Sequence, residues 1–401
     1  MLLVALVLVG CSQRTPRTQP TATSSNAPAI STPTASLDAV AISTPTVSRV
    51  TKVVRAAPTA SASVSLTDPM AAPRAAHSAT LLPDGRVLVA GGCTLDSCEL
   101  GPDGASAELY DPETGAFTPT GRLTKPRVGH AGVLVVGKVL VLGGWDTDGV
   151  SASAELYDPD TGSFTPAGPM NSKRGGFTAT RLSDGRVLIA GGYDGERYLA
   201  SAELYDPLSG VFTSIEDMTA QRNSHIAAAL PDGRVLMAGG SSGEGEVVAS
   251  AEIFDSKSGK FSETGDMTVV RYKHGAAPLP DGRVLIVGGS DARDSQGRYA
   301  SAEVYDAVSG AFTATDAMAA ERFKLPDAVA VLPDGRVLVA GGSRRPEVYD
   351  PRSQTFGPVA GAVGSDWAFA TATTLLDRGV LVTGGYDSAI NPTAAAWLYR
   401  P

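Results

Sequence analysis

The stretch LLPDGRVLVAGG, residues 81–92, sets the pattern for most of this 401-residue chain. Its Asp84-Gly85 pair stands between two apolar runs, and Asp-Gly in that context is a strong signal for a tight β-hairpin. The same pair precedes an apolar run four more times, at residues 184–185, 232–233, 281–282 and 334–335. We therefore expect a chain of repeated hairpins.

A Gly doublet ends each apolar run, and seven doublets recur along the chain. They begin at residues 91, 143, 191, 239, 288, 341 and 384. In six units the doublet is followed by a variable stretch and then by a segment such as SAELYDPETGAF, residues 106–117, in which Asp-Pro opens a second turn. Each unit is predicted to be a four-stranded antiparallel meander.

The composition excludes several classes of protein. There are 33 Lys and Arg against 42 Asp and Glu, a net charge of −9, and no basic block of the kind that binding to nucleic acid or an anionic membrane surface needs. The 45 Gly and 27 Pro indicate a chain interrupted by turns rather than one of long helices. We predict an all-β protein with no nucleic-acid partner.

The first eleven residues predict an export signal. Residues 2–9 are all apolar, and the run ends at Leu8-Val9-Gly10-Cys11, too short to span a bilayer. It resembles a bacterial lipobox, in which Cys11 is lipidated, and Ser12 favours the outer membrane by the same resemblance. An ordinary secretory signal is the alternative, and the absence of preceding basic residues leaves an upstream start codon open. We expect a cell-envelope protein that meets the membrane only through an N-terminal lipid anchor.

Residues 12–61 are predicted to be a disordered tether. Between residues 12 and 50, 26 of 39 residues are Ser, Thr, Pro or Ala and none is aromatic, so little apolar surface is available to offset the cost of ordering. A flexible segment of about 50 residues reaches roughly 40 Å, enough to hold a domain clear of a membrane. The folded domain is expected to span residues 62–401.

The repeat resembles the Kelch family over residues 64–401. A lone four-stranded sheet cannot bury both faces, so seven such units are expected to stack radially. A period near 50 residues with a Gly doublet and a following Tyr is similar to the Kelch repeat, and this resemblance implies a seven-bladed β-propeller. Kelch fourth strands often carry Trp, whereas this chain has Phe, at Phe117, Phe164, Phe212, Phe261, Phe312 and Phe356.

The two chain ends are expected to complete one unit. In five units an apolar residue such as Leu123 lies six positions after the fourth-strand Phe, and Met70 lies in the same relation to Val64. The seventh unit stops near Tyr399, where its fourth strand should begin. We predict that residues 62–67 pair with residues 394–399, which would remove the exposed edges of the last blade.

The histidines occupy one repeat slot, which favours packing over catalysis. They form the pairs Arg74/His77, Arg127/His130, Arg222/His225 and Arg271/His274. The slot also accepts Phe177, Leu325 and, by spacing, Phe369 after Asp366. The Glu of the Ser-Ala-Glu segment is replaced by Trp397 in the seventh unit, where Asp366 replaces the Arg. This joint loss predicts a structural Arg–Glu pair.

The variable loops carry the predicted binding site. The second-to-third loops and the links between units share one end of the propeller, and variable loops on a rigid scaffold usually hold specificity. Aromatic and Arg side chains mixed with carboxylates suit a carbohydrate or protein partner. Alternatively, the aromatic residues after each doublet only cover sheet edges. The predicted ligand-binding residues are Trp145, Asp146, Tyr193, Arg197, Tyr198, Arg298, Tyr299, Arg344, Trp367 and Tyr386, with Lys273 and Lys324 presented by the links.

The three cysteines predict one disulfide. An exported protein with three Cys has one odd residue, and lipidation of Cys11 leaves Cys93 and Cys98 to pair. They are five positions apart in the longest second-to-third loop, so the ring would close if that loop turns back. Two free thiols are the alternative.

We expect a binding or scaffold protein rather than an enzyme, with no cofactor or metal. The alternative is a carbohydrate-active enzyme, because Kelch propellers include copper radical oxidases and sialic acid epimerases. The oxidases need a thioether-forming Cys beside ligand Tyr and His, whereas Cys93 and Cys98 share a loop without His. Asp146 and Asp148 hint at calcium but lack the further ligands of a full loop.

Overall fold

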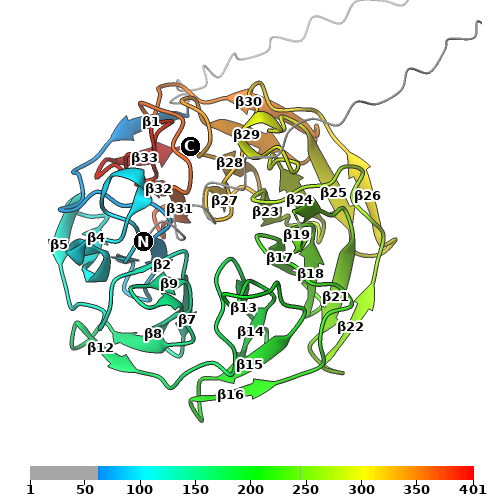
Figure 1. The fold of residues 1–401 in the computed structure, drawn as a ribbon. Coiled ribbons are helices and arrows are strands. Elements are labelled where there is room, and N and C mark those ends of the chain that lie inside the picture. Colours follow the sequence, from blue (N-terminus) through cyan, green and yellow to red (C-terminus); the bar gives the residue numbers. More distant parts are fainter. Residues whose placement is uncertain (1–61, 244) are drawn as a thin grey trace, which may run out of the picture. The chain divides into compact units, whose positions relative to one another are not determined.

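The computed structural model describes residues 62–243 and 245–401. This part of the chain consists of β-strands with three short 3₁₀ helices: η1 (Asp96–Cys98), η2 (Pro102–Ala105) and η3 (Asp294–Gln296). None of its helices is long and apolar enough to cross a membrane. Seven four-stranded sheets follow one another around a centre (Figure 1). The predicted export signal with Cys11 and the predicted tether lie outside the described residues.

Six of the sheets are meanders in chain order. In the first, β2 (Ser78–Leu81), β3 (Val87–Ala90), β4 (Ala107–Asp111) and β5 (Ala116–Pro119) pair in succession, each antiparallel to the next. The Asp-Gly turn joins the first two strands and the Asp-Pro turn joins the last two, so the predicted meander is confirmed.

The other five meanders repeat this order. Their strands are β7 (Ala131–Val135), β8 (Lys138–Leu142), β11 (Ala154–Asp158) and β12 (Ser163–Pro166); β13 (Thr178–Arg181), β14 (Val187–Ala190), β15 (Ala202–Asp206) and β16 (Val211–Ser214); β17 (Ile226–Ala229), β18 (Arg234–Ala238), β21 (Ala251–Asp255) and β22 (Lys260–Glu263); β23 (Gly275–Pro278), β24 (Val284–Val287), β25 (Ala302–Asp306) and β26 (Ala311–Ala314); and β27 (Val329–Val331), β28 (Val337–Val339), β29 (Glu347–Asp350) and β30 (Thr355–Pro358). Two small sheets are formed by β6 (Arg127–Val128), β9 (Trp145–Asp146) and β10 (Gly149–Val150), and by β19 (Ser241–Gly243) and β20 (Glu246–Val247).

The seventh sheet joins the two ends of the described chain. Its order is β1 (Ser63–Leu66), β33 (Ala396–Arg400), β32 (Val380–Thr383) and β31 (Thr371–Thr374). Strand β1 pairs antiparallel with β33, with Val64 opposite Tyr399. In Figure 1 the blue β1 and red β33 lie side by side. The pairing predicted for residues 62–67 is therefore present.

The hydrophobic core lies between consecutive sheets. Every residue of β3 is buried, as expected of a strand covered on both faces. Leu88 from the first sheet and Val139 from the second belong to one apolar cluster with Tyr157. The third-strand aromatic ring packs on the fourth-strand Phe, as Tyr110 does on Phe117 with ring centroids 4.9 Å apart, and this pair recurs in six sheets.

The Gly doublets allow the links between sheets to pack closely. A Cβ at Gly92 would lie 2.8 Å from the carbonyl oxygen of Ala75, and one at Gly91 would lie 2.5 Å from the His130 ring. Both glycines have positive φ, 68° at Gly91 and 95° at Gly92. A side chain here would collide with a link backbone and with the next unit's His, which explains why glycine recurs at this point.

Six buried Arg–Glu pairs hold the links to the sheets. Arg222 is fully buried, and its Nε lies 3.0 Å from Oε1 of Glu252 on β21. The same Arg donates to the carbonyls of Gly239 and Ser250, while Oε2 of Glu252 accepts from the backbone N–H of Thr219. The predicted structural pairing is therefore present. The equivalent pairs are Arg74–Glu108, Arg127–Glu155, Arg174–Glu203, Arg271–Glu303 and Arg322–Glu347.

The seventh unit replaces the ion pair with two tryptophans. In the first unit, a Cβ added at Gly92 would contact Arg74 and His77 of the link. In the seventh unit, a Cβ added at Gly385 would contact Trp367 and Ala370 in the same way, so Trp367 occupies the position that Arg has in the other links. Its ring packs on Trp397, with centroids 5.8 Å apart. Residue spacing had aligned Asp366 with the Arg position, which is one residue too early. The links correspond by their contacts with the Gly doublet, and these contacts assign the Arg position to Trp367.

Candidate functional site

A ring of left-handed link residues surrounds the centre of the sheets. One residue of each link has a φ between 49° and 66°, and backbone hydrogen bonds join neighbouring members. Ser224 donates to Gly176 at 2.7 Å, Lys273 to Ser224 at 2.9 Å, and Ala76 to Phe369 at 3.1 Å, which joins the first link to the seventh. The seven residues, here termed the left-handed ring, are Ala76, Gly129, Gly176, Ser224, Lys273, Lys324 and Phe369.

The left-handed ring borders a cavity of 390 Å³. The walls come from the first strands of the sheets and supply hydroxyl groups, including those of Thr178, Thr180, Thr371 and Thr373. Its lining includes every ring member except Lys324. Four members on one arc of the ring are small (Ala, Gly, Gly and Ser), whereas the other three are Lys, Lys and Phe. The site is therefore asymmetric within a repetitive scaffold.

The cavity histidines are neutral packing residues. Nε2 of His77 lies 2.8 Å from the Thr383 hydroxyl, and Nε2 of His130 lies 3.0 Å from the Ser78 hydroxyl. Burial lowers the pKa of His77 to about 3, so the ring is uncharged at neutral pH. His225 likewise contacts the Thr178 hydroxyl, so the three cavity histidines each contact the first or second strand of the preceding sheet, whereas His274 is buried without a hydrogen-bond partner among the described residues.

Two lysines of the left-handed ring share one carboxylate. Asp294 on η3 accepts from Lys273 Nζ at 3.0 Å and from the Tyr272 hydroxyl at 2.6 Å, both on Oδ1. Nζ of Lys324 lies 3.9 Å from Oδ2 of the same carboxylate. All three charged groups are buried. We call Lys273, Lys324 and Asp294 the lysine cluster.

Aromatic rings surround Lys324. Its Nζ lies 4.6 Å from the ring centroid of Phe323, 5.4 Å from that of Tyr386 and 5.9 Å from that of Phe369. Ring faces attract an ammonium group, which compensates part of its lost hydration. Burial, followed by the charge of Lys273, nevertheless lowers the pKa of Lys324 to about 7.

Asp327 is a second distinctive group in the cavity. Asp327 is exposed and lines the cavity, and the protein that surrounds its carboxyl withdraws part of the water and raises the pKa of that group to about 6. No ion pair is formed by Asp327 within the residues described. A carboxyl that titrates near neutral pH can exchange a proton with a bound molecule.

Two of the predicted binding residues lie beside the lysine cluster. Arg298 places its guanidinium carbon 4.6 Å from the Phe323 ring centroid, the same ring that Lys324 contacts. Tyr386 packs near Lys324 and is 3% exposed, and its hydroxyl has no hydrogen-bond partner among the described residues. The structure thus brings Arg298 and Tyr386 together with Lys324, which the sequence placed in a link.

Trp145 and Asp146 are buried in the fold. Trp145 is 5% exposed, and its ring fills the space over Gly129 and Gly175, where an added Cβ would meet it at 2.9 and 2.5 Å. Asp146 accepts the backbone N–H of Asp148 at 2.8 Å. These positions favour the packing alternative for Trp145, although its ring also lines part of the cavity.

The remaining predicted residues are spread over the loop end. Tyr193 and Tyr198 form a half-buried ring pair with centroids 5.6 Å apart, beside Arg197, whose side chain is 78% exposed. Tyr299 packs on the structural Arg271 at 5.3 Å. Arg344 is exposed, and its backbone N–H donates to Asp366. Trp367 belongs to the tryptophan pair of the seventh unit and donates its indole N–H to Val363.

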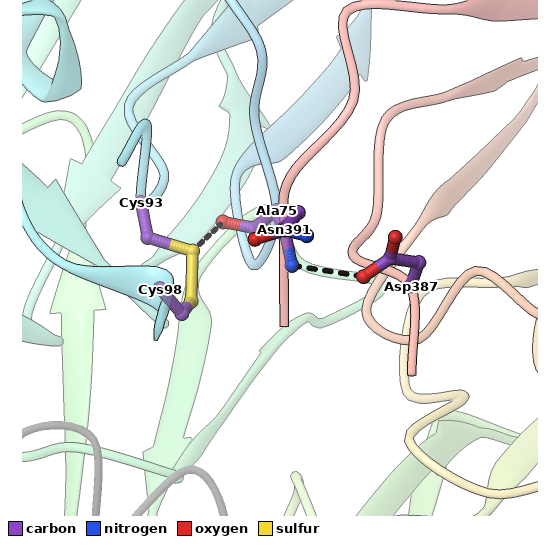
Figure 2. The surroundings of a disulfide bond; sticks show 5 residues. All are labelled: Ala75, Cys93, Cys98, Asp387 and Asn391. Carbon is purple, nitrogen blue, oxygen red and sulfur yellow. Dashed lines mark hydrogen bonds between the residues drawn. A yellow bond between two sulfur atoms is a disulfide. The ribbon is translucent and has the colours of Figure 1, made fainter. Parts of the chain in front are cut away.

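The predicted disulfide is present. Cys93 and Cys98 are bonded, with Cα atoms 4.9 Å apart, and both side chains are buried (Figure 2). Sγ of Cys93 lies 3.4 Å from the carbonyl oxygen of Ala75, in the link next to the left-handed ring. Figure 2 also shows the neighbouring turn in which Asn391 donates to Asp387.

Asp294, Tyr272, Phe323, Phe369 and Asp327 were missed as site residues. The sequence did carry one signal for the two lysines. The residue before the His position is Ala, Gly, Gly and Ser in the first four links and Lys in the fifth and sixth, so among these six links a small residue is replaced only there. Asp294 carried no such signal, since it reaches Lys324 only through the fold of η3.

The described residues, 62–243 and 245–401, contain no cluster of three or more acidic, His and Cys side chains of the kind that holds a metal ion. Both described cysteines are in the disulfide, so neither can form a thioether. Asp146 and Asp148, considered above as calcium ligands, form a turn in which the backbone N–H of Asp148 donates to Asp146.

Comparisons with known proteins agree with this architecture. Residues 126–171 and 175–219 match the Kelch motif, which supports a Kelch-repeat family for the chain. No curated protein shows significant sequence similarity. Among 1285 matching chains of solved structures is a fungal alcohol oxidase of the AA5 family, in complex with copper. It has a TM-score of 0.64 at 18% identity, over 84% of this chain and 75% of that chain, which is a likeness of fold.

Proposed function

We propose that residues 62–401 form a seven-bladed β-propeller closed by the chain ends. Strand β1 pairs with β33, the backbone N–H of Ala76 donates to Phe369, and His77 contacts Thr383, so three separate sets of contacts cross the join. Deleting residues 62–67 should then expose the edge of β33 and cause a loss of stability or self-association. A deletion variant with unchanged melting temperature and oligomeric state would contradict the closure.

We propose that the chain is exported and held at the membrane by a lipid on Cys11, with residues 12–61 as the tether. The lipobox-like sequence and the Cys93–Cys98 disulfide, which is typical of an oxidising compartment, support this. Cys11→Ala should release the protein from the membrane fraction. Retention of that variant in the membrane would exclude the lipid anchor.

We propose that the protein is a binding or scaffold module that recognises a carbohydrate or a surface protein through its loop end. The observation that carries this proposal is the asymmetry of the left-handed ring, where Lys, Lys and Phe interrupt a series of small residues beside a cavity. If this position served only folding, the small residues of the other links would suffice in all seven. Ligand recognition by a few placed polar and aromatic groups around a pocket accounts for it.

A paired substitution tests this function. Tyr193→Ala with Tyr198→Ala removes a ring pair at the loop end, and Val308→Ala, at a turn residue 99% exposed, is the matched control. On a glycan array, or with a surface-protein partner, the Tyr variant should bind at least roughly tenfold more weakly with little change in melting temperature. Equal binding by wild type and the Tyr variant would contradict a loop-end site.

A carbohydrate-active enzyme, epimerase- or oxidase-like, is the second candidate. The raised pKa of Asp327 in the cavity favours it, because a carboxyl that titrates near pH 6 suits acid–base catalysis. The donor set does not favour copper chemistry. Turnover of a sugar by wild type and its loss in Asp327→Asn, with sugar binding retained, would establish this alternative over the binding module.

A further inference from the structure

The lysine cluster and its neighbour Arg298 carry more positive than negative charge. Lys273 and Lys324 both contact the carboxylate of Asp294, and Arg298 packs on the Phe323 ring that Lys324 also contacts. The Arg298 charge lies close enough to Lys324 to help lower the pKa of that lysine. Burying unbalanced cations is unfavourable unless an anion compensates them.

Asp294 cannot provide that compensation alone. Its Oδ1 already accepts from both Lys273 and the Tyr272 hydroxyl, and Nζ of Lys324 is 3.9 Å from Oδ2, beyond hydrogen-bond distance. Arg298 donates its Nε to the carbonyl of Ser295 rather than to a carboxylate. Lys324 and Arg298 therefore retain charge that Asp294 does not satisfy.

A buried hydroxyl points to the same place. Tyr386 is 3% exposed and its hydroxyl has no partner among the described residues, although buried hydroxyls are normally hydrogen-bonded. Its ring lies 5.4 Å from Nζ of Lys324, and burial, followed by the charge of Asp294, raises the pKa of Tyr386. The hydroxyl is thus a donor without a partner among the described residues, on a ring that contacts Lys324.

A cavity meets this group of residues at Lys273 and at Phe369, whose ring lies 5.9 Å from Nζ of Lys324, while Lys324, Arg298 and Tyr386 are not part of its lining. The 390 Å³ cavity is lined by Lys273 and Phe369 on one side and by Ala76, Gly129 and Gly176 on the other. This volume lies within the range of small-molecule pockets, and the small ring residues leave room across from the lysines.

We propose that the lysine cluster, with Arg298 and Tyr386, binds the oxyanion group of a small ligand, a carboxylate or a phosphate, whose body occupies the adjoining cavity. This rests on the proposed function, since it names the ligand chemistry of the same loop end. Lys324 and Arg298 supply charge, Tyr386 supplies a neutral donor, and Asp294 fixes Lys273 in place.

Three sugars that differ only at C6 test the proposal with the full chain. D-glucuronate carries a carboxylate, D-glucose 6-phosphate a phosphate, and D-glucose neither. Calorimetry should detect binding of at least one anionic sugar, which also identifies the oxyanion, and at least roughly tenfold weaker binding of glucose. Equal affinity for all three, or no binding of either anionic sugar, would overturn the inference.

Variants locate the site. Lys324→Gln and Arg298→Gln should each weaken binding of the anionic sugar roughly tenfold, whereas Lys138→Gln, at the exposed first residue of β8, should not. Arg298 is half-buried, so its variant provides the test if Lys324→Gln fails to fold. Anionic-sugar affinity unchanged in both variants would contradict the assignment. Binding on the glycan array without binding of either anionic sugar would reject this inference and leave the proposed function standing.

Discussion

Two sets of basic residues in the same links behave differently. The six buried Arg residues recur in every link but the seventh, and each is paired with a Glu and donates to backbone carbonyls, although Nε of Arg74, Arg127 and Arg322 has no hydrogen-bond partner in the described part of the chain. The left-handed ring, two residues further on, changes from small residues to Lys273, Lys324 and Phe369. Regular positions hold the scaffold together, and the departure from regularity coincides with the site proposed for a ligand. The predictions below test that division.

The largest effect is expected from breaking one regular pair. Arg222→Ala leaves Glu252 buried without its cation, which should cost about 3–5 kcal/mol in the free energy of unfolding. The control is Arg186→Ala, which removes an Arg at an exposed turn pair with Asp184 and should cost about 1 kcal/mol or less. Denaturant unfolding measures both. Equal losses in the two variants would contradict a special role for the buried pairs.

The tryptophan pair should contribute a comparable amount to the free energy of unfolding in the seventh unit. Trp397 is 3% exposed and packs on Trp367, so Trp397→Ala should destabilise the protein by about 3 kcal/mol. Leu66→Ala on β1, at a residue 71% exposed, is the control in the same sheet and should change little. If Trp397→Ala unfolds at the wild-type denaturant concentration, the tryptophans do not replace the ion pair.

The disulfide supports the link next to the left-handed ring. Replacing both Cys93 and Cys98 by Ser should lower the free energy of unfolding by about 2 kcal/mol, because the closed loop is short. Thermal unfolding of the variant and of wild type, with and without reductant, measures the change. A variant as stable as oxidised wild type would show that the loop is held by packing alone.

The smallest effect concerns Asp327 and is visible through pH. Its folded pKa of about 6 is above the ordinary value, so the folded state binds more protons than the unfolded state between about pH 4 and 6, and stability falls as pH rises through this range. Asp327→Asn should therefore be more stable than wild type at pH 7 and equal to it at pH 3.5. Parallel pH profiles for the two proteins would contradict the raised pKa.

Much of the scaffold could be predicted from the sequence because its determinants are local. Asp-Gly turns, Gly doublets and apolar runs each act within about ten residues, and the paired loss of Arg and Glu exposed their interaction. The seventh link was misaligned by one residue, since Trp367 fills the Arg slot only through packing on Trp397. Local spacing contains no information about that contact.

The site was harder to predict because it depends on contacts between units. Arg298 and Tyr386 were predicted, but their convergence on Lys324 requires η3 and three links to meet. Trp145 has the composition of a binding residue and is nevertheless buried, because Gly129 and Gly175 leave a space that its ring fills. Residue type alone does not separate these two outcomes.

The most direct test compares two buried cations of one link, Arg322 and Lys324. Arg322 is paired with Glu347, whereas Lys324 belongs to the left-handed ring, where Ser224 shows that serine adopts the same backbone conformation. By equilibrium unfolding at pH 7, we predict that Arg322→Ser loses about 3–5 kcal/mol while Lys324→Ser is at least as stable as wild type. A Lys324→Ser variant as unstable as Arg322→Ser would show that both cations serve the scaffold, and would contradict the separation of a binding ring from a structural one.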